Sequence, residues 1–244
     1  DGEGGEPYYT MMQNKTGDGK FDQNTVPVGA NDQLATELWV GRIDMHNLPT
    51  MGGGTQAQAM GLLRQYLTKD HNYRHGGLAA NHRLLIGPGG GPGYAVGDPN
   101  YHYKGIVPQA NTEWIKLADY PDTRAAILNS LNASPAMFFF NHGRGNPTYI
   151  FYVVYVTELA AAERKAVFWN MYGSYYGWTL YQNDVLRSIL AMPNYGLAAS
   201  YYRTSDYFLT RIGGTIGEAH HLDLNGLIRK PEYVLPPEWL PYYG

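Results

Sequence analysis

The amino-acid sequence predicts an α/β domain in which a mostly parallel sheet is flanked by helices on both faces. Residues 136–140 and 166–171 are short apolar runs that stop abruptly at small or polar residues. Such runs are typical of strands that are buried on both faces, as they are in a parallel sheet. Further apolar runs alternate with helical patterns along most of the chain, and this alternation predicts βαβ units.

Five segments have the pattern of strands, and we expect them to share one mostly parallel sheet. The predicted strands are residues 37–43, 83–87, 136–140, 166–171 and 196–201. The glycines of residues 87–93 have the spacing of a dinucleotide-binding turn, but that motif requires a helix immediately afterwards. Because Pro92 and Pro99 prevent such a helix, we interpret this stretch as a loop.

Helix signals lie between the predicted strands. Thr55 is the expected N-cap of a helix that runs to about Tyr66 and carries an apolar stripe on one face. Thr157 is expected to cap a helix over residues 158–164 in the same way. The other predicted helices are residues 122–131, residues 183–190 and a final helix that begins within residues 213–219.

The composition argues against several classes of partner. The chain has 244 residues, a formal net charge of -3 and 16% charged residues. No cluster of Lys and Arg recurs along it, so nucleic acid is not an expected partner. No run approaches the roughly 18 consecutive apolar residues of a transmembrane helix. The sequence contains no cysteine, which rules out disulfides and thiolate metal sites.

Residues 14–22 follow the first nine positions of an EF-hand-type calcium loop. Gly19 stands at the sixth position, where the loop turns sharply. Thr25 stands at the twelfth, where a bidentate glutamate is usual, so we expect weak affinity. The alternative is a Gly-Asp-rich turn without an ion. The expected calcium ligands are the side chains of Asn14, Thr16, Asp18 and Asp22 and the main-chain carbonyl of Lys20.

Two pairs of histidines could bind a metal ion. His71 and His75 are four residues apart and could share a helix face, but Asn72 and the following glycines favour a fraying helix end over a zinc site. His220 and His221 are adjacent and would point about 100° apart on a helix, so they do not form a paired site.

Four runs of the sequence carry a family resemblance. They are residues 17–22 (GDGKFD), 37–44 (ELWVGRID), 62–71 (LLRQYLTKDH) and 215–219 (TIGEA). As a set they resemble the gingipain-like family of secreted cysteine peptidases, which have a caspase-type fold. The resemblance is spread over most of residues 7–225. It implies a secreted or cell-surface protein, and a longer precursor of which this chain is the later part.

The resemblance also implies where a catalytic dyad would lie. The family histidine falls on His142, within Asn141-His142-Gly143, at the end of one predicted strand. The family cysteine should follow the next strand, where the closest match is Ser174, beside Gly173. The carboxyl ends of parallel strands are where open α/β sheets place their chemistry.

Serine in place of cysteine changes what the site requires. A serine hydroxyl is harder to ionise than a thiol, so it needs a well-placed base, an orienting acid and an oxyanion hole. Asp184, Asp206 and Glu218 are possible orienting acids, and the spacing singles out none of them.

Two functions follow from these observations. The first is a non-catalytic binding or assembly module of a surface layer, filament or adhesin, with other protein chains as partners and calcium as a brace. The second is a hydrolase that uses a Ser174–His142 dyad or a nucleophile outside this segment. An enzyme requires an open cleft at the dyad, whereas an assembly protein would have that cleft filled by Tyr172, Tyr175 or Tyr176.

The sequence also suggests how the chain is organised. The expected parts are an N-terminal segment with the calcium-type loop over residues 1–36, a caspase-like α/β domain over residues 37–225 and a Pro-rich tail over residues 226–244.

Overall fold

The fold is known from a computed structural model of the chain. The structure describes residues 41–78, 81–88, 103, 105–117, 121–143, 145–172, 176, 181–201 and 214–219. The chain divides into two units, residues 43–204 and a second unit that combines residues 1–42 with residues 205–244. The domain boundaries predicted at residues 36 and 225 fall in the second unit and stay a prediction.

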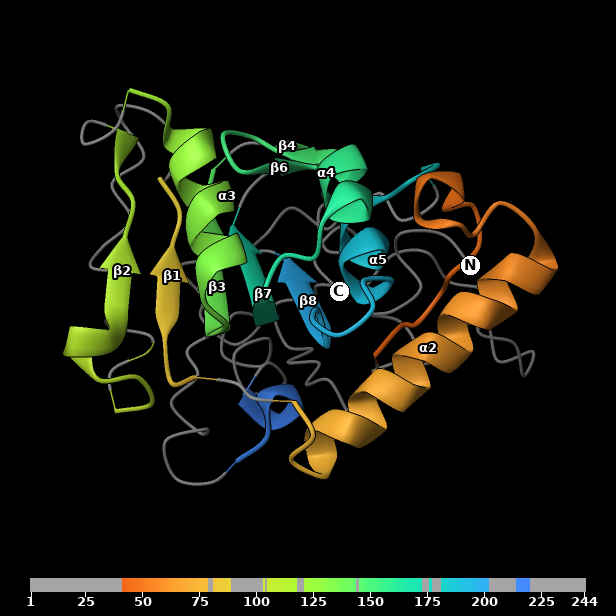
Figure 1. Cartoon of the computed structure of the whole chain (residues 1–244), viewed down its shortest axis with the longest axis horizontal. Coiled ribbons are helices and arrows are strands. Elements are labelled where there is room, and N and C mark those ends of the chain that lie inside the picture. The colour runs from red at the N-terminus through yellow and green to blue at the C-terminus, as the bar shows by residue number, and fades with distance from the viewer. Residues whose placement is uncertain are drawn as a thin grey trace, which may run out of the picture. The chain divides into compact units, whose positions relative to one another are not determined.

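A five-stranded parallel sheet forms the centre of the unit 43–204, which confirms the predicted α/β class (Figure 1). Every neighbouring pair of its strands is parallel. In spatial order the strands are β2 (Thr112–Trp114), β1 (Leu84–Ile86), β3 (Ala136–His142), β7 (Ala166–Tyr172) and β8 (Ala198–Tyr201).

The two apolar runs that predicted the sheet are its central strands. β3 and β7 pair directly, with Phe138 opposite Phe168 and Phe139 opposite Trp169. Because side chains alternate along a strand, Phe139 and Trp169 face one side of the sheet and Phe138 and Phe168 face the other. The facing rings pack closely, at centroid distances of 4.7 Å for Phe139 and Trp169 and 5.6 Å for Phe138 and Phe168.

Helices contact both faces of this sheet. Ile127 and Leu131 of α3 (Thr123–Ala133) share the main core cluster with Phe139, and Figure 1 shows α3 lying over β1 and β3. The short helices α4 (Val156–Ala161) and α5 (Val185–Leu190) contribute to the same cluster. On the opposite face, Tyr73 of α2 (Gln56–Arg74) meets Phe168 edge to face at 5.7 Å.

α2 begins as predicted but ends later. Thr55 forms a capping box with Gln58, and the helix continues past Tyr66 to Arg74, since no glycine or proline occurs between Tyr66 and Gly76.

Hydrogen bonds join α2 to the turn between α5 and β8. The Lys69 side chain is only 3% exposed, and its ammonium nitrogen lies 2.7–3.0 Å from four main-chain oxygens. Gln65 donates to Ala191 O at 3.0 Å and Tyr66 donates to Leu197 O at 2.8 Å. The four oxygens that surround Lys69 Nζ belong to Leu190, Met192, Tyr195 and Gly196.

Three details differ from the sequence prediction. Residues 41–43, the described part of the predicted strand 37–43, carry no strand. The helix predicted over residues 158–164 begins at Val156 after an N-cap at Tyr155, and not at Thr157; the Glu158 carboxylate accepts the Tyr155 N–H at 2.8 Å and fixes that start. A small antiparallel sheet was not predicted, and its strands are β4 (Gly145–Asn146), β5 (Tyr149–Ile150) and β6 (Val154–Tyr155).

Candidate functional site

The carboxyl edge of the central sheet is the candidate site. β3 ends at His142 and β7 ends at Tyr172, and these two residues are directly paired in the register of the two strands. Since the strands are parallel, both chain ends leave the sheet at the same edge. Ser174 follows Tyr172 by two residues and lies outside the described residues.

Tyr176 is the side chain that the structure places beside this edge. It is fully buried, it belongs to the main core cluster, and its hydroxyl donates to the main-chain oxygen of Gly143 at 3.0 Å. Its ring lies so close to Gly145 that a Cβ atom at that position would overlap it. Glycine at position 145 is therefore what allows the aromatic ring to pack this close to the chain that follows β3. Tyr176 is one of the three tyrosines that the sequence suggested as cleft-filling residues.

Asn141 stands next to His142 and has unusual surroundings. Its side chain is 1% exposed, and among the described residues neither its Oδ1 nor its Nδ2 atom has a hydrogen-bond partner. Its carboxamide lies over Gly87, which directly follows β1, and a Cβ atom at Gly87 would overlap Oδ1. A buried amide without partners costs roughly 1–3 kcal/mol. The sequence motif Asn141-His142-Gly143 drew attention to the histidine, and nothing in it indicated this unpaired amide.

A second asparagine lies on the opposite face of the same edge and is hydrogen-bonded. Asn170 is 2% exposed, and its Oδ1 accepts from the Ser200 hydroxyl at 3.3 Å. Its Nδ2 lies 3.5 Å from the Tyr103 hydroxyl oxygen. Tyr103 also packs against Phe138 at a centroid distance of 5.2 Å. No pattern in the sequence placed Tyr103 at this edge, because the loop that contains it has no strand or helix periodicity.

Of the three candidate orienting acids, one has a clear structural task. Asp184 is fully buried, and its Oδ1 caps α5 by accepting the N–H of Arg187 at 2.9 Å. The same oxygen lies 3.7 Å from Arg187 Nε. Asp184 therefore caps the start of α5, and its negative charge offsets that of the buried Arg187 guanidinium.

The other two candidate acids belong to the second unit of the chain. Glu218 belongs to the second unit, where it forms a capping box with Thr215, and its hydrogen bond from the Thr215 N–H lowers the pKa of the carboxyl. Asp206 lies outside the described residues.

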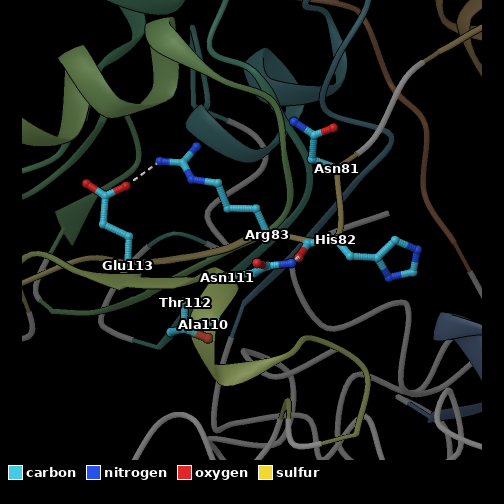
Figure 2. A pocket seen from close by; sticks show the side chains of 7 residues that line it. All are labelled: Asn81, His82, Arg83, Ala110, Asn111, Thr112 and Glu113. Carbon is cyan, nitrogen blue, oxygen red and sulfur yellow. Dashed lines mark hydrogen bonds and ion pairs between the residues drawn. The ribbon is translucent and has the colours of Figure 1, made fainter.

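An open hollow of about 650 Å³ lies at the opposite, amino-terminal ends of β1 and β2 (Figure 2). Figure 2 shows Arg83 directed toward Glu113, with which it forms an ion pair, while the ring of His82 points away from both. Arg83 also donates to Ser134 O at 2.8 Å. Its charge is therefore used to join β1, β2 and the end of α3, and the lining offers no converging set of reactive groups. The lining residues are Asn81, His82, Arg83, Ala110, Asn111, Thr112 and Glu113.

Metal ligands were predicted in a part of the chain that the structure does not describe. Asn14, Thr16, Asp18, Lys20 and Asp22 all lie outside the described residues. Within the described ranges, no group of three or more His, Asp or Glu side chains lies close enough together to hold a metal ion. None of the helices in the described part of the chain is long and apolar enough to span a membrane.

Comparison of the chain with known protein families, with curated proteins and with solved structures finds no significant match.

Proposed function

We propose that this chain is a non-catalytic binding or assembly module on a gingipain-like, caspase-type α/β scaffold, secreted or displayed at a cell surface. The observation that carries the proposal is the buried Tyr176 ring, which packs against Gly145 and is hydrogen-bonded to Gly143 O beside His142. The total absence of cysteine supports the same conclusion, since the resembled family uses a thiol nucleophile.

The physical argument concerns space and orientation at the sheet edge. A peptidase needs room beside its base for the scissile carbonyl and for the donors that stabilise the oxyanion. The Tyr176 ring is packed against Gly145, three residues after His142, and its hydroxyl donates its proton to Gly143 O. A tyrosine whose ring is packed and whose hydroxyl is hydrogen-bonded is typical of a protein core. A substrate that binds in this space would have to displace it.

Exposed aromatic side chains next to the site favour a binding role. Phe151 and Tyr152, in the turn between β5 and β6, and Tyr155 of β6 are each 40–44% exposed. Phe151 and Tyr152 contact each other at a ring-centroid distance of 4.1 Å, and Tyr152 holds a left-handed backbone conformation with φ 59. Tyrosine and phenylalanine are enriched in protein–protein interfaces. This small sheet begins three residues after His142.

A hydrolase is the second candidate function, because β3 and β7 are direct neighbours and end together at His142 and Tyr172. A Ser174–His142 dyad, or a nucleophile supplied from outside this segment, would use that edge. The two functions differ in whether Ser174 and His142 matter for turnover.

Peptidase assays on four forms of the chain separate the two functions. We expect the wild type, Ser174→Ala, His142→Ala and Ser174→Cys to show no hydrolysis of unfolded or basic peptides above background. Restoring a thiol alone supplies little rate without positioned partners. Circular dichroism would establish that the variants fold. Wild-type hydrolysis that both Ser174→Ala and His142→Ala abolish would establish the hydrolase, and His142-dependent activity of Ser174→Cys would show that the rest of the machinery survives.

We also propose that residues 14–22 bind one calcium ion as a structural brace, through the oxygen ligands named from the sequence. Chelation is expected to lower the melting temperature, because an ion that binds only the native state stabilises it by mass action. Asp18→Asn should abolish most of this calcium response, since it removes one of two carboxylate ligands. An unchanged melting temperature in excess chelator would contradict the proposal.

A further inference from the structure

The last turn of α2 brings two histidine rings together at the protein surface. His71 lies inside the helix and His75 is its C-cap, with the His75 N–H bonded to His71 O at 3.1 Å. The ring centroids are 4.2 Å apart and the ring planes are tilted by 40°. Both side chains are exposed. The fraying that the sequence suggested here does not separate them, because regular helix continues to Arg74.

We propose that His71 and His75 together bind one divalent transition-metal ion, each through one ring nitrogen, with water in the remaining coordination positions. Two imidazoles at positions i and i+4 lie on one face of a helix, and this is the spacing by which helix-borne histidine pairs hold zinc. Imidazole is a good ligand for Zn²⁺, Ni²⁺ and Cu²⁺ but not for Mg²⁺ or Ca²⁺.

The helix prepares the pair for chelation. Both backbone positions are held by regular main-chain hydrogen bonds, so only side-chain torsions need to adjust when the second ligand binds. The contact between the two rings shows that they already occupy the same region of space. A second imidazole on the same rigid element therefore binds at a high effective concentration.

The charges around the pair also suit a cation. The C-terminal end of an α-helix carries a partial negative charge that favours cations within its last turn. Arg74, which directly precedes His75, is paired with Asp70, at 2.8 Å between Nε and Oδ2, so its charge is largely compensated. The Tyr73 ring is directed to Phe168 in the sheet and leaves the outer face of this turn to the histidines.

Calorimetric titration of the purified full chain with Zn²⁺ and with Ni²⁺ tests the proposal. We expect one site in the micromolar range, and about a tenfold or greater loss of affinity in His71→Gln and in His75→Gln, since losing a ligand costs at least as much as losing a second-shell partner. Glutamine keeps the helix propensity, so the fold should persist. His82→Gln is the matched control, because His82 is exposed but lies at the amino-terminal end of β1.

Further measurements test whether imidazole is the ligand. The affinity for Zn²⁺ should fall as the pH is lowered, because protons compete with the metal for imidazole. Mg²⁺ should not compete with Zn²⁺ for the site. Bound Cu²⁺ should show two nitrogen ligands by electron paramagnetic resonance in the wild type and one in either variant. The absence of Zn²⁺ and Ni²⁺ binding, or binding that both glutamine variants leave unchanged, would overturn the proposal.

Discussion

Lys69→Met is expected to lower the free energy of unfolding by about 2 kcal/mol at pH 7. The substitution leaves four buried main-chain oxygens without the donor that now joins them, those of Leu190, Met192, Tyr195 and Gly196. Methionine has a similar length and fills the same space without donating. Chemical denaturation followed by circular dichroism measures the effect. Lys116→Met is the control, since Lys116 is exposed and should change stability by less than about 0.5 kcal/mol.

The effect of Lys69→Met should grow as the pH rises above 7. Burial lowers the pKa of Lys69 to about 7, although the charges of Glu163 and Asp70 act in the opposite direction. In the unfolded chain the same amine has its ordinary pKa of about 10.5. Between these values the unfolded state binds more protons than the folded state, so the stability of the wild type rises with pH by roughly 2 kcal/mol between pH 7 and pH 9.

The stability of the Lys69→Met variant should not rise in this way between pH 7 and pH 9. Above about pH 10 a second effect begins, because burial has raised the pKa of Tyr66, Tyr73 and Tyr195. There the unfolded state loses tyrosine protons first, and stability falls with further increase in pH. Parallel pH profiles of the wild type and Lys69→Met between pH 7 and pH 9 would show that Lys69 does not titrate in this window.

Gly145→Ala is expected to destabilise the protein by about 3 kcal/mol, because the added methyl group would overlap the Tyr176 ring. Neither partner can move freely: β4 is paired with β5 through Gly145 and Ile150, and the Tyr176 ring is enclosed in the core. The loss is measured by thermal and chemical denaturation. Gly61→Ala is the matched control, since Gly61 lies in α2 with nothing near its Cβ position, and it should stabilise the helix by up to about 1 kcal/mol.

A double-mutant cycle shows whether the clash with Tyr176 is the cause. Tyr176→Ala alone should cost about 3–5 kcal/mol through the cavity that it leaves. In the double variant the methyl group at position 145 enters empty space, so the combined loss should be close to that of Tyr176→Ala alone. Additive losses would show that the alanine acts through the β4 backbone and not through the ring.

The sequence predicted most of the central sheet because strands buried on both faces leave an apolar pattern that little else produces. Four of the five predicted strands lie in the sheet, and α3 begins at Thr123, one residue after the predicted start, with Asp122 as its N-cap. β2 was missed because its three residues, Thr112 to Trp114, are polar or half-exposed at the sheet edge. The three strands of the small sheet have two residues each, too few for any periodicity.

The candidate site was harder to predict than the fold. Strand ends located His142 at the sheet edge, because a parallel sheet brings such ends together whatever the side chains are. The burial of Tyr176 depends on a glycine 31 positions earlier in the chain, a pairing that has no local signature. Asn141 is similar, since its carboxamide lies against Gly87, which follows β1 and is 54 positions earlier in the chain.

The hydrogen bonds from α2 to the turn before β8 determine how the molecule can open. α2 buries only Ala59 and Lys69 fully, so its apolar face alone would hold it loosely. Gln65, Tyr66 and Lys69 instead attach it to main-chain oxygens more than 120 positions away in the sequence. If α2 detached, the main-chain oxygens at the end of α5 and in the turn before β8 would lose these hydrogen-bond donors at the same time. Amide hydrogens of α2 and of β8 consequently belong to one cooperative unit for exchange with solvent, although α2 lies at the margin of the sheet.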